Sequence, residues 1–189
     1  AVEEDDDYDL IEPSTRKVTK TLNARGVFEK IIDLAWHNGE PGVLFIDTAN
    51  RDNMTPQLGL FEATNPCGEQ WLLPYESCNL GSINLANFVE DGNVDYDRLA
   101  EVVRTATIFL DNVIDCNRFP IPEIEEMTLK TRKIGMGIMG LHDMLIQMEI
   151  PYGSKEGRSL AGKVMKYIRD ASEQCSIELA KEKTPFPAY

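Results

Sequence analysis

Apolar residues recur at intervals of three and four in two long stretches of the chain, 96–116 and 155–183. This spacing places the apolar side chains on one face of a helix. Asp95 or Asp97 can begin the first helix, and the prolines that follow Cys116 cannot continue it. The pattern therefore predicts two long amphipathic helices. The apolar positions of the first are Leu99, Val102, Val103, Ala106, Phe109, Leu110 and Val113.

Three shorter segments also have helical patterns. The first runs from about 24 to 37, where Asn23 can cap its start and Gly39 can end it. The other two are expected near 123–131 and 139–148. Helices should therefore outweigh strands in this chain.

Two segments are typical of strands. Residues 43–46 form a continuous apolar run between Gly42 and Asp47, which predicts a strand buried on both faces. A second strand-like stretch covers 80–89 and is ended by the turn residues 91–93. Buried strands among amphipathic helices indicate an α/β fold.

Composition restricts the classes of function. The chain has 189 residues, a hydrophobic content of 42% and a net charge of −13. The length suits one domain with a sizeable core, and the negative charge argues against binding of a nucleic-acid polymer. The acidic run 3–7 favours a solvated start, so residues 1–20 are expected to be extended or frayed.

The ends of the chain and its hydropathy carry further expectations. No initiator Met precedes Ala1, and Tyr189 does not resemble a natural terminus, so we expect a segment of a longer protein. No apolar run approaches the roughly 18 residues of a membrane helix, and no signal peptide is visible. We therefore expect a soluble, cytoplasmic protein that does not bind membranes.

The four cysteines do not suggest a metal or disulfide framework. They contain no Cys-x-x-Cys pair, and the chain has only two histidines, which argues against structural zinc. The length of the chain and its ordinary apolar content also argue against a secreted disulfide scaffold. Cys116 and Cys175 lie in helical patterns, which predicts that both are small buried hydrophobes.

The segment 65–69 reads Asn-Pro-Cys-Gly-Glu, and a further cysteine, Cys78, follows Cys67 by eleven residues. In an extended loop, residues two apart point to the same side, so Asn65, Cys67 and Glu69 could address one bound molecule. Turn chemistry alone favours an ordinary turn with a half-buried thiol and a surface carboxylate. Both interpretations stay open on these residues alone.

Residues 135–140 read Gly-Met-Gly-Ile-Met-Gly and match the Gly-x-Gly-x-x-Gly pattern of dinucleotide sites. That fingerprint requires an apolar strand before it, whereas the basic residues 130–133 precede it here. We therefore predict a short strand and a tight turn that lead into a helix.

Three segments together resemble the large catalytic subunit of ribonucleotide reductase. They are the Asn-x-Cys-x-Glu motif at 65–69, the segment 76–85 (Glu-Ser-Cys-Asn-Leu-Gly-Ser-Ile-Asn-Leu) and the segment 135–143 (Gly-Met-Gly-Ile-Met-Gly-Leu-His-Asp). The eleven-residue spacing and the wording Asn-Pro-Cys-Gly-Glu-Gln are most similar to the adenosylcobalamin-dependent class II branch. The resemblance implies a helix-rich part of a ten-stranded α/β barrel, in which residues 65–69 form a finger loop directed toward the barrel centre.

The resemblance also implies a role for each motif residue. Cys67 would carry a thiyl radical, Glu69 would accept the proton of the ribose 3′-hydroxyl, and Asn65 would hold the sugar hydroxyls. Cys78 would be one of two thiols that supply electrons and end as a disulfide, with its partner upstream of this chain. Thioredoxin or glutaredoxin would reduce that disulfide, and the full-length protein would be a homodimer.

Two alternatives remain beside this interpretation. The chain could belong to the class I branch, whose radical comes from a separate metal-containing subunit, or it could be a non-catalytic interaction domain that retains the fold. In the family, the phosphate-binding loop follows this segment, and the allosteric sites lie mostly before it. The isolated segment is therefore expected to be inactive.

Overall fold

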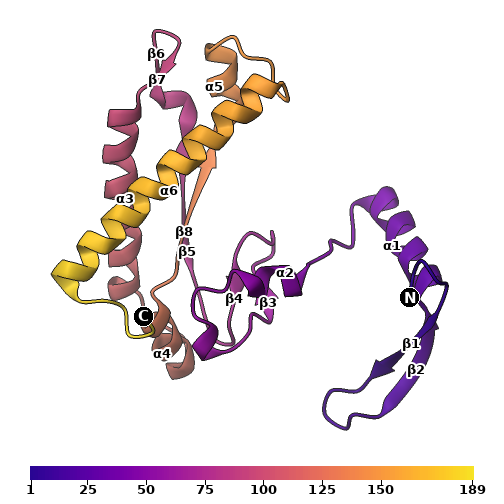
Figure 1. The fold of residues 1–189 in the computed structure, drawn as a ribbon. Helices are drawn as coiled ribbons and strands as arrows, with labels where there is room; N and C mark the ends of the chain where they lie inside the picture. Colours follow the sequence, from indigo (N-terminus) through magenta and orange to yellow (C-terminus); the bar gives the residue numbers. More distant parts are fainter. The chain divides into compact units, whose positions relative to one another are not determined.

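The computed structural model describes residues 1–189, which divide into two compact units, Ala1–Phe45 and Ile46–Tyr189. Figure 1 traces the chain through its elements from indigo to yellow. The motif residues all lie in the second unit. Each unit is described by itself.

The first unit begins with an antiparallel hairpin of β1 (Asp7–Ile11) and β2 (Val18–Asn23). The helix α1 (Ala24–Asn38) follows directly. As predicted, the Asn23 side chain caps it, accepting a hydrogen bond of 2.8 Å from the Gly26 N–H.

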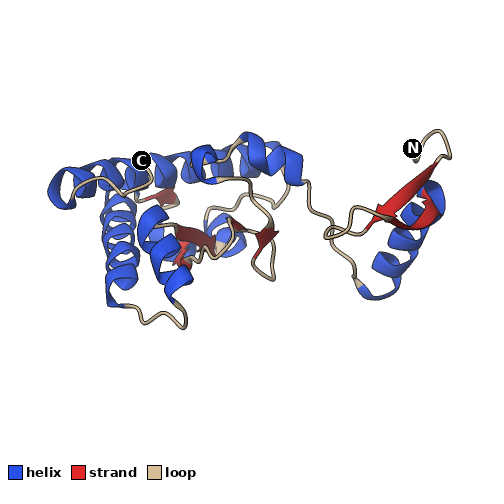
Figure 2. Ribbon diagram, turned by 90° about the horizontal axis from the view of Figure 1, so that it is seen from below, coloured by secondary structure: helices blue, strands red, loops and turns tan.

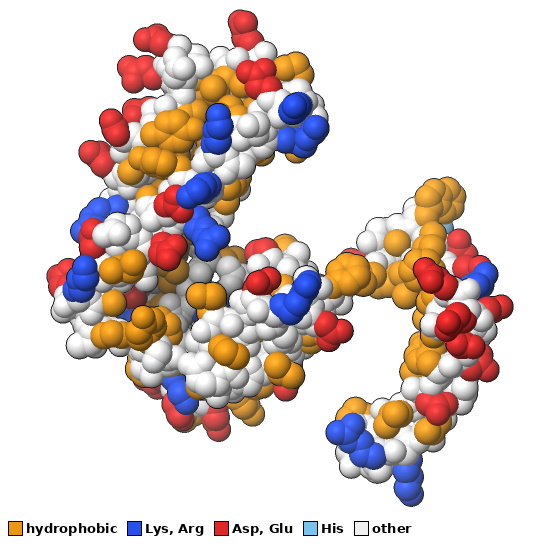
Figure 3. All heavy atoms as spheres, viewed as in Figure 1, with side chains coloured by type: hydrophobic (Ala, Val, Ile, Leu, Met, Phe, Trp, Pro, Cys, Tyr) orange, Lys and Arg blue, Asp and Glu red, His pale blue; other side chains and the backbone are white.

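The apolar side chains of α1 are largely exposed within this unit. Trp36 is 88% exposed, and Phe28 and Ile32 are about half exposed. Figure 3 shows such orange apolar side chains on the surface of the unit. The amphipathic pattern therefore predicted the helix correctly, although much of its apolar stripe stays uncovered within residues 1–45.

The predicted strand at 43–46 is wrong. Residues 43–45 are exposed and lie outside any element, with Phe45 71% exposed, and Ile46 begins the helix α2 (Ile46–Arg51). A strand needs a neighbouring backbone for its hydrogen bonds, and no strand of this chain pairs with the run. An apolar run indicates a preference for burial, but it does not identify the partner.

The second unit is rich in helices, as Figure 2 shows in blue. It contains two short 3₁₀ turns, six strands and four helices after α2. Their bounds are η1 (Pro56–Leu58), β3 (Ala63–Thr64), β4 (Trp71–Leu72), β5 (Asn79–Asn84), η2 (Leu85–Phe88), β6 (Val89–Glu90), β7 (Asn93–Val94), α3 (Tyr96–Cys116), α4 (Pro122–Thr131), β8 (Ile134–Met139), α5 (Leu141–Gln147) and α6 (Lys155–Lys183).

The strands β5 and β8 form a parallel pair, in register from Asn79 opposite Ile134 to Asn84 opposite Met139. The connection between them contains α3 and α4, as parallel neighbours require a long crossover. This βαβ arrangement confirms the predicted α/β class. Within this chain the two strands pair only with each other.

The predicted strand over 80–89 ends earlier than expected. β5 stops at Asn84, whose side-chain oxygen accepts a hydrogen bond of 3.2 Å from the Ala86 N–H. This contact starts the 3₁₀ turn η2, which buries Leu85 and Phe88. A local cap therefore interrupts an apolar run that otherwise suits a strand.

The long helices α3 and α6 have the predicted bounds and pack against each other, and α3 also packs against the β5–β8 pair. Their buried apolar side chains share one core with β5, η2 and α5. Its fully or nearly fully buried members are Ile83, Leu85, Phe88, Leu99, Val103, Met144, Val164 and Ile168. No helix has both the length and the apolar character needed to cross a bilayer.

Candidate active site

The strands β3 and β4 form a two-residue antiparallel ladder that presents the finger loop (residues 65–69). The side-chain oxygen of Asn65 accepts a hydrogen bond of 3.0 Å from the Gln70 N–H, which closes the loop. Gly68 has φ +82° and donates its N–H to the Asn65 carbonyl at 3.0 Å. Glycine suits this left-handed position because it has no Cβ.

These contacts limit what Asn65 can do chemically. Its side-chain oxygen is engaged by the loop backbone, whereas its amide Nδ2 makes no hydrogen bond within the chain. An amide nitrogen only donates. Asn65 could therefore donate a hydrogen bond to a ligand oxygen without opening the loop.

Cys67 and Glu69 are both exposed, and neither side chain makes a hydrogen bond or ion pair within the chain. The thiol and the carboxylate are therefore accessible to a bound molecule. The carboxylate of Glu69 also acts electrostatically on Cys78, since it is one of the charges that raise the pKa of that thiol. The side chains of Gln70, next to the finger loop, and of Leu80, two residues after Cys78, both lie against Gly135, so the structure brings the two segments near each other.

Cys78 is a partly buried free thiol. Burial is the main cause that raises its pKa above the ordinary value for cysteine, while the positive charge of Lys133 lowers it. Glu76 and Glu69 add smaller upward contributions. The environment therefore favours the protonated thiol over the thiolate.

The residues on either side of Cys78 are firmly anchored. The hydroxyl groups of Ser77 and Thr128 share a hydrogen bond of 2.7 Å, and Asn79 Nδ2 donates to the Leu110 carbonyl at 2.8 Å. These contacts attach the segment to α4 and α3. Cys78 has no hydrogen bond of its own, so its thiol is held in place by its neighbours.

Glu76 and Lys133 form an ion pair beside this segment, with 2.7 Å between Lys133 Nζ and Glu76 Oε2. The sequence did not single out either residue for a role. Glu76 lies within the segment that carries the resemblance, and Lys133 entered only as part of the basic run before the glycine motif. Charge complementarity between residues so far apart in the chain is visible only in the fold.

The glycine motif forms the predicted strand and turn. Residues 134–139 make β8, and Gly140, with φ +69°, turns the chain into α5. A Cβ at Gly135 would collide with the side chains of Leu80 and Gln70. Glycine at this position therefore lets β5 and the residue after the finger loop approach β8 closely.

The two remaining cysteines differ from each other. Cys175 is buried, at 1% exposure, as predicted. Cys116 is exposed, so its predicted burial is wrong. It follows the buried Ile114 by two residues, which is about 200° around a helix, and so points away from the core face of α3.

Alkylation under native conditions should therefore rank the thiols by exposure and pKa. We expect Cys67 and Cys116 to react first, Cys78 more slowly at neutral pH and Cys175 last. The rate at Cys78 should continue to rise well above neutral pH, because its raised pKa delays formation of the thiolate. Peptide mass spectrometry after timed labelling measures all four rates, and faster labelling of Cys175 than of Cys67 would contradict this arrangement.

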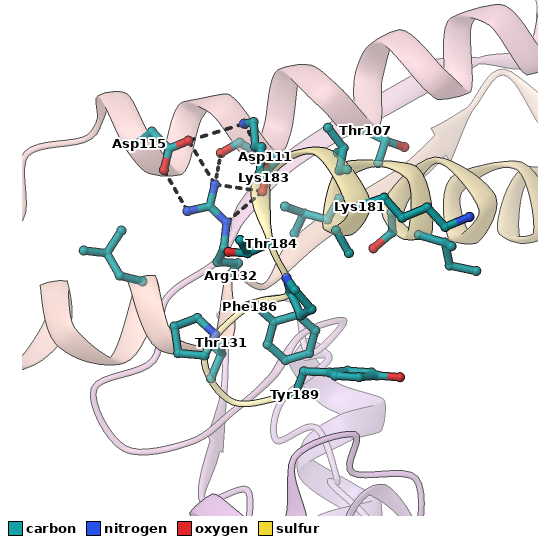
Figure 4. A pocket seen from close by; sticks show the side chains of 18 residues that line it. Thr107, Asp111, Asp115, Thr131, Arg132, Lys181, Lys183, Thr184, Phe186 and Tyr189 are labelled. Carbon is teal, nitrogen blue, oxygen red and sulfur yellow. Dashed lines mark hydrogen bonds and ion pairs between the residues drawn. The ribbon is translucent and has the colours of Figure 1, made fainter.

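A cavity of about 690 Å³ lies away from the finger loop. It lies among α3, α4, α6 and the last residues of the chain, and none of the motif residues lines it (Figure 4). Arg132 pairs there with Asp111 and Asp115, and Lys183 pairs with the same two carboxylates. The hydrogen bond from Arg132 lowers the pKa of Asp115.

Two basic and two acidic groups of that cavity are thus paired with one another, whereas Lys181, which also lines it, makes no ion pair. Because none of the motif residues reaches this cavity, the candidate site is placed at the motif residues. The chain contains no group of three or more His, Cys, Asp or Glu side chains that could hold a metal ion.

Comparisons with known proteins agree with these features. A family model described as "Ribonucleotide reductase, barrel domain" matches residues 2–189. A vitamin B12-dependent ribonucleoside-diphosphate reductase of Thermoplasma acidophilum is 53% identical over 98% of this chain and 24% of its own length. A protein of the same name from Mycobacterium tuberculosis is 49% identical over all of this chain and 27% of its own length.

Among solved structures, the class Id ribonucleotide reductase alpha subunit of Actinobacillus ureae matches with a TM-score of 0.74 and 25% identity. The match covers 87% of this chain and 33% of that subunit. The chain thus spans about a quarter of the length of the first two relatives and a third of that structure.

Proposed function

This chain belongs to the ribonucleotide reductase family as a segment of its barrel domain, and from this premise we propose that the full-length protein reduces ribonucleotides to deoxyribonucleotides. The main support is one arrangement of side chains. An exposed thiol and an exposed carboxylate lie two residues apart on the finger loop, and the residue after the loop packs against β8 beside the segment that carries the partly buried Cys78. These are the groups that radical reduction of a ribose requires.

Cys67 begins and ends the reaction as the hydrogen carrier. Its thiyl radical takes the hydrogen atom from C3′, because the S–H and sugar C–H bonds are close in strength. Glu69 accepts the proton of the 3′-hydroxyl as a general base. The 2′-hydroxyl then leaves as water, and Cys67 finally returns the hydrogen atom to C3′.

Asn65 orients the sugar during these steps. Its free Nδ2 group donates to a hydroxyl oxygen, while its own oxygen keeps the loop closed through Gln70. Holding the reacting atoms in this way converts a chance encounter into a reaction within one complex.

Cys78 supplies one half of the reducing equivalents. It and a second thiol outside this chain together give two hydrogen atoms and become a disulfide, so ribonucleotide and dithiol yield deoxyribonucleotide, water and disulfide. A raised pKa suits this role because the protonated thiol is the form that carries the hydrogen.

Adenosylcobalamin is the proposed cofactor, in line with the names of the two relatives. When bound, it supplies the radical that initiates the reaction. The exposed thiol of Cys67, which has no hydrogen-bond partner in the chain, fits an acceptor of that radical. No residue of this chain is assigned to the corrin itself.

The partners and location follow from the thiol chemistry. The disulfide at Cys78 must be reduced by thiol exchange, for which thioredoxin or glutaredoxin is suited. Such exchange and four free cysteines fit the reducing cytoplasm. We also propose that the full-length protein is a homodimer, and that reduction requires the parts beyond these 189 residues.

The test is a turnover assay of the full-length protein with a ribonucleoside diphosphate and dithiothreitol. We expect deoxyribonucleotide only when adenosylcobalamin is added. Product that forms without cobalamin but with a metal-containing second subunit would favour the class I alternative. The structural match of this chain to a class Id alpha subunit is the observation that supports this alternative. The absence of product under both conditions would favour a non-catalytic interaction domain.

A further inference from the structure

Lys133 contacts both sides of the hairpin that carries the finger loop. It immediately precedes β8, and its side chain is 22% exposed. Its Nζ donates to the Trp71 carbonyl in β4 at 2.8 Å and lies 4.7 Å from the centre of the Phe61 ring. Phe61 lies before β3 and Trp71 lies after the loop, so one ammonium group holds the hairpin at both stems.

The same ammonium group reaches the Cys78 segment through Glu76. The Glu76 side chain is 0% exposed, and its Oε2 accepts hydrogen bonds from Lys133 Nζ at 2.7 Å and from the Leu73 N–H at 2.9 Å. Its Oε1 is buried without a partner. A carboxylate buried in this way is costly unless a positive charge is beside it, and Lys133 is the only cation paired with it.

A second contact supports the same arrangement. The side chain of Gln70, the residue after the finger loop, lies so close to Gly135 of β8 that a Cβ there would collide with it. The hairpin thus meets the start of β8 at two points, through the hydrogen bond of Lys133 to Trp71 and through the packing of Gln70 against Gly135. Cys78 lies two residues after Glu76, just before β5, which pairs with β8.

We propose that Lys133 and Glu76 are a pair of positioning residues that holds the finger loop and Cys78 in one fixed relation. The proposal rests on the proposed function, because that function requires the Cys67 and Cys78 thiols to act on one sugar. Neither residue is proposed to contact the substrate. Both act through the backbone and side chains that they hold.

The two charges of the pair also have opposite electrostatic effects on the Cys78 thiol, which a purely structural contact would not have. Lys133 lowers the pKa of the Cys78 thiol and Glu76 raises it. Removal of one charge should therefore shift the reactivity of Cys78 in one direction, and removal of the other should shift it in the opposite direction. In either variant Ser77 and Asn79 still anchor Cys78, so the exposure of its thiol should not change and only the charge effect should appear. Unfolding of the whole segment would instead increase the reactivity in both variants.

The experiment uses the full-length protein and measures alkylation of Cys78 by iodoacetamide against pH. Glu76→Gln keeps the shape of the side chain and one acceptor oxygen for Lys133 Nζ and the Leu73 N–H but loses the negative charge that raises the pKa of the Cys78 thiol, so labelling at pH 7 should become about three- to tenfold faster. Lys133→Met should slow labelling by a similar factor. The double variant should return close to the wild-type profile.

Lys163→Met is the matched control, since Lys163 is exposed on α6 and makes no ion pair. It should leave the profile of Cys78 unchanged. If Lys133→Met destabilises the fold, Glu76→Gln still tests the pair, because it is nearly isosteric. Labelling that changes in the same direction in both variants, or by less than twofold in Glu76→Gln, would overturn the proposal.

Activity gives a second readout that separates positioning from substrate binding. Lys133→Met should lower kcat by about 10- to 100-fold, because a misplacement of about 1 Å can cost roughly 100-fold. The KM for ribonucleotide should change little. A rise in KM alone would overturn the positioning role. The labelling profile requires no turnover, so it can reject the positioning pair while the turnover assay still supports the reductase function. The turnover assay can likewise reject the reductase function while the labelling profile still supports the pair.

Discussion

Replacing Cys67 by Ser in the full-length protein should reduce ribonucleotide reduction to background, a loss on the order of 10⁴-fold or more for a group without a substitute. The O–H bond of serine is much stronger than the C–H bond of the sugar, so a serine cannot exchange a hydrogen atom with C3′. The side chain of Cys67 makes no hydrogen bond within the chain. The change should therefore leave the finger loop and its Asn65 contacts intact.

The measurement is deoxyribonucleotide formed per minute, with Cys116→Ser as the control. Cys116 is likewise exposed, but it lies at the end of α3 and belongs to none of the motifs. The control should keep wild-type turnover, and both variants should keep the wild-type melting temperature. Turnover within tenfold of wild type in Cys67→Ser would exclude the radical role of this residue.

Glu69→Gln should lower kcat by roughly 10²- to 10⁴-fold, the usual contribution of a general base. The amide has nearly the same shape as the carboxylate but cannot accept the 3′-hydroxyl proton. Because Glu69 is exposed and unpaired, neither the stability of the protein nor the KM for ribonucleotide should change much. Steady-state kinetics on the full-length protein separate kcat from KM.

Glu62→Gln provides the matched control for that variant. Glu62 is also exposed and lies just before β3, on the same hairpin as the finger loop. The same loss of one negative charge there should leave kcat within about twofold of wild type, as for surface changes with no partner. A similar loss of kcat in both variants would mean that turnover depends on the total charge of the hairpin and would contradict the role of Glu69 as a general base.

The helices were predictable because their signals are local. Asp95 accepts a hydrogen bond from the Arg98 N–H at 3.0 Å, and Ser154 accepts one from the Gly157 N–H at 2.9 Å, so each long helix begins at a residue that caps it. The regular apolar spacing then runs from each cap to the end of its helix. Short-range chemistry of this kind can be read without knowledge of the rest of the fold.

The errors arise where an outcome depends on a distant partner or on a fraction of a helical turn. The apolar run 43–46 has no strand beside it within the chain, and so it forms none. Cys116 continues the α3 pattern by residue type, but its angular position turns it away from the core. Neither fact can be recovered from the hydropathy of the segment alone.

By itself, the sequence determined the chemical groups of this protein: the motif with Cys67 and Glu69, the spacing to Cys78 and the helices that frame them. These depend on residue types and on contacts within a few positions along the chain. Only the tertiary structure decided what holds these groups together, namely the parallel register of β5 with β8 and the contact of Lys133 with Glu76. These two residues are 57 positions apart, and a buried carboxylate finds its cation only when the crossover through α3 and α4 returns the chain beside it.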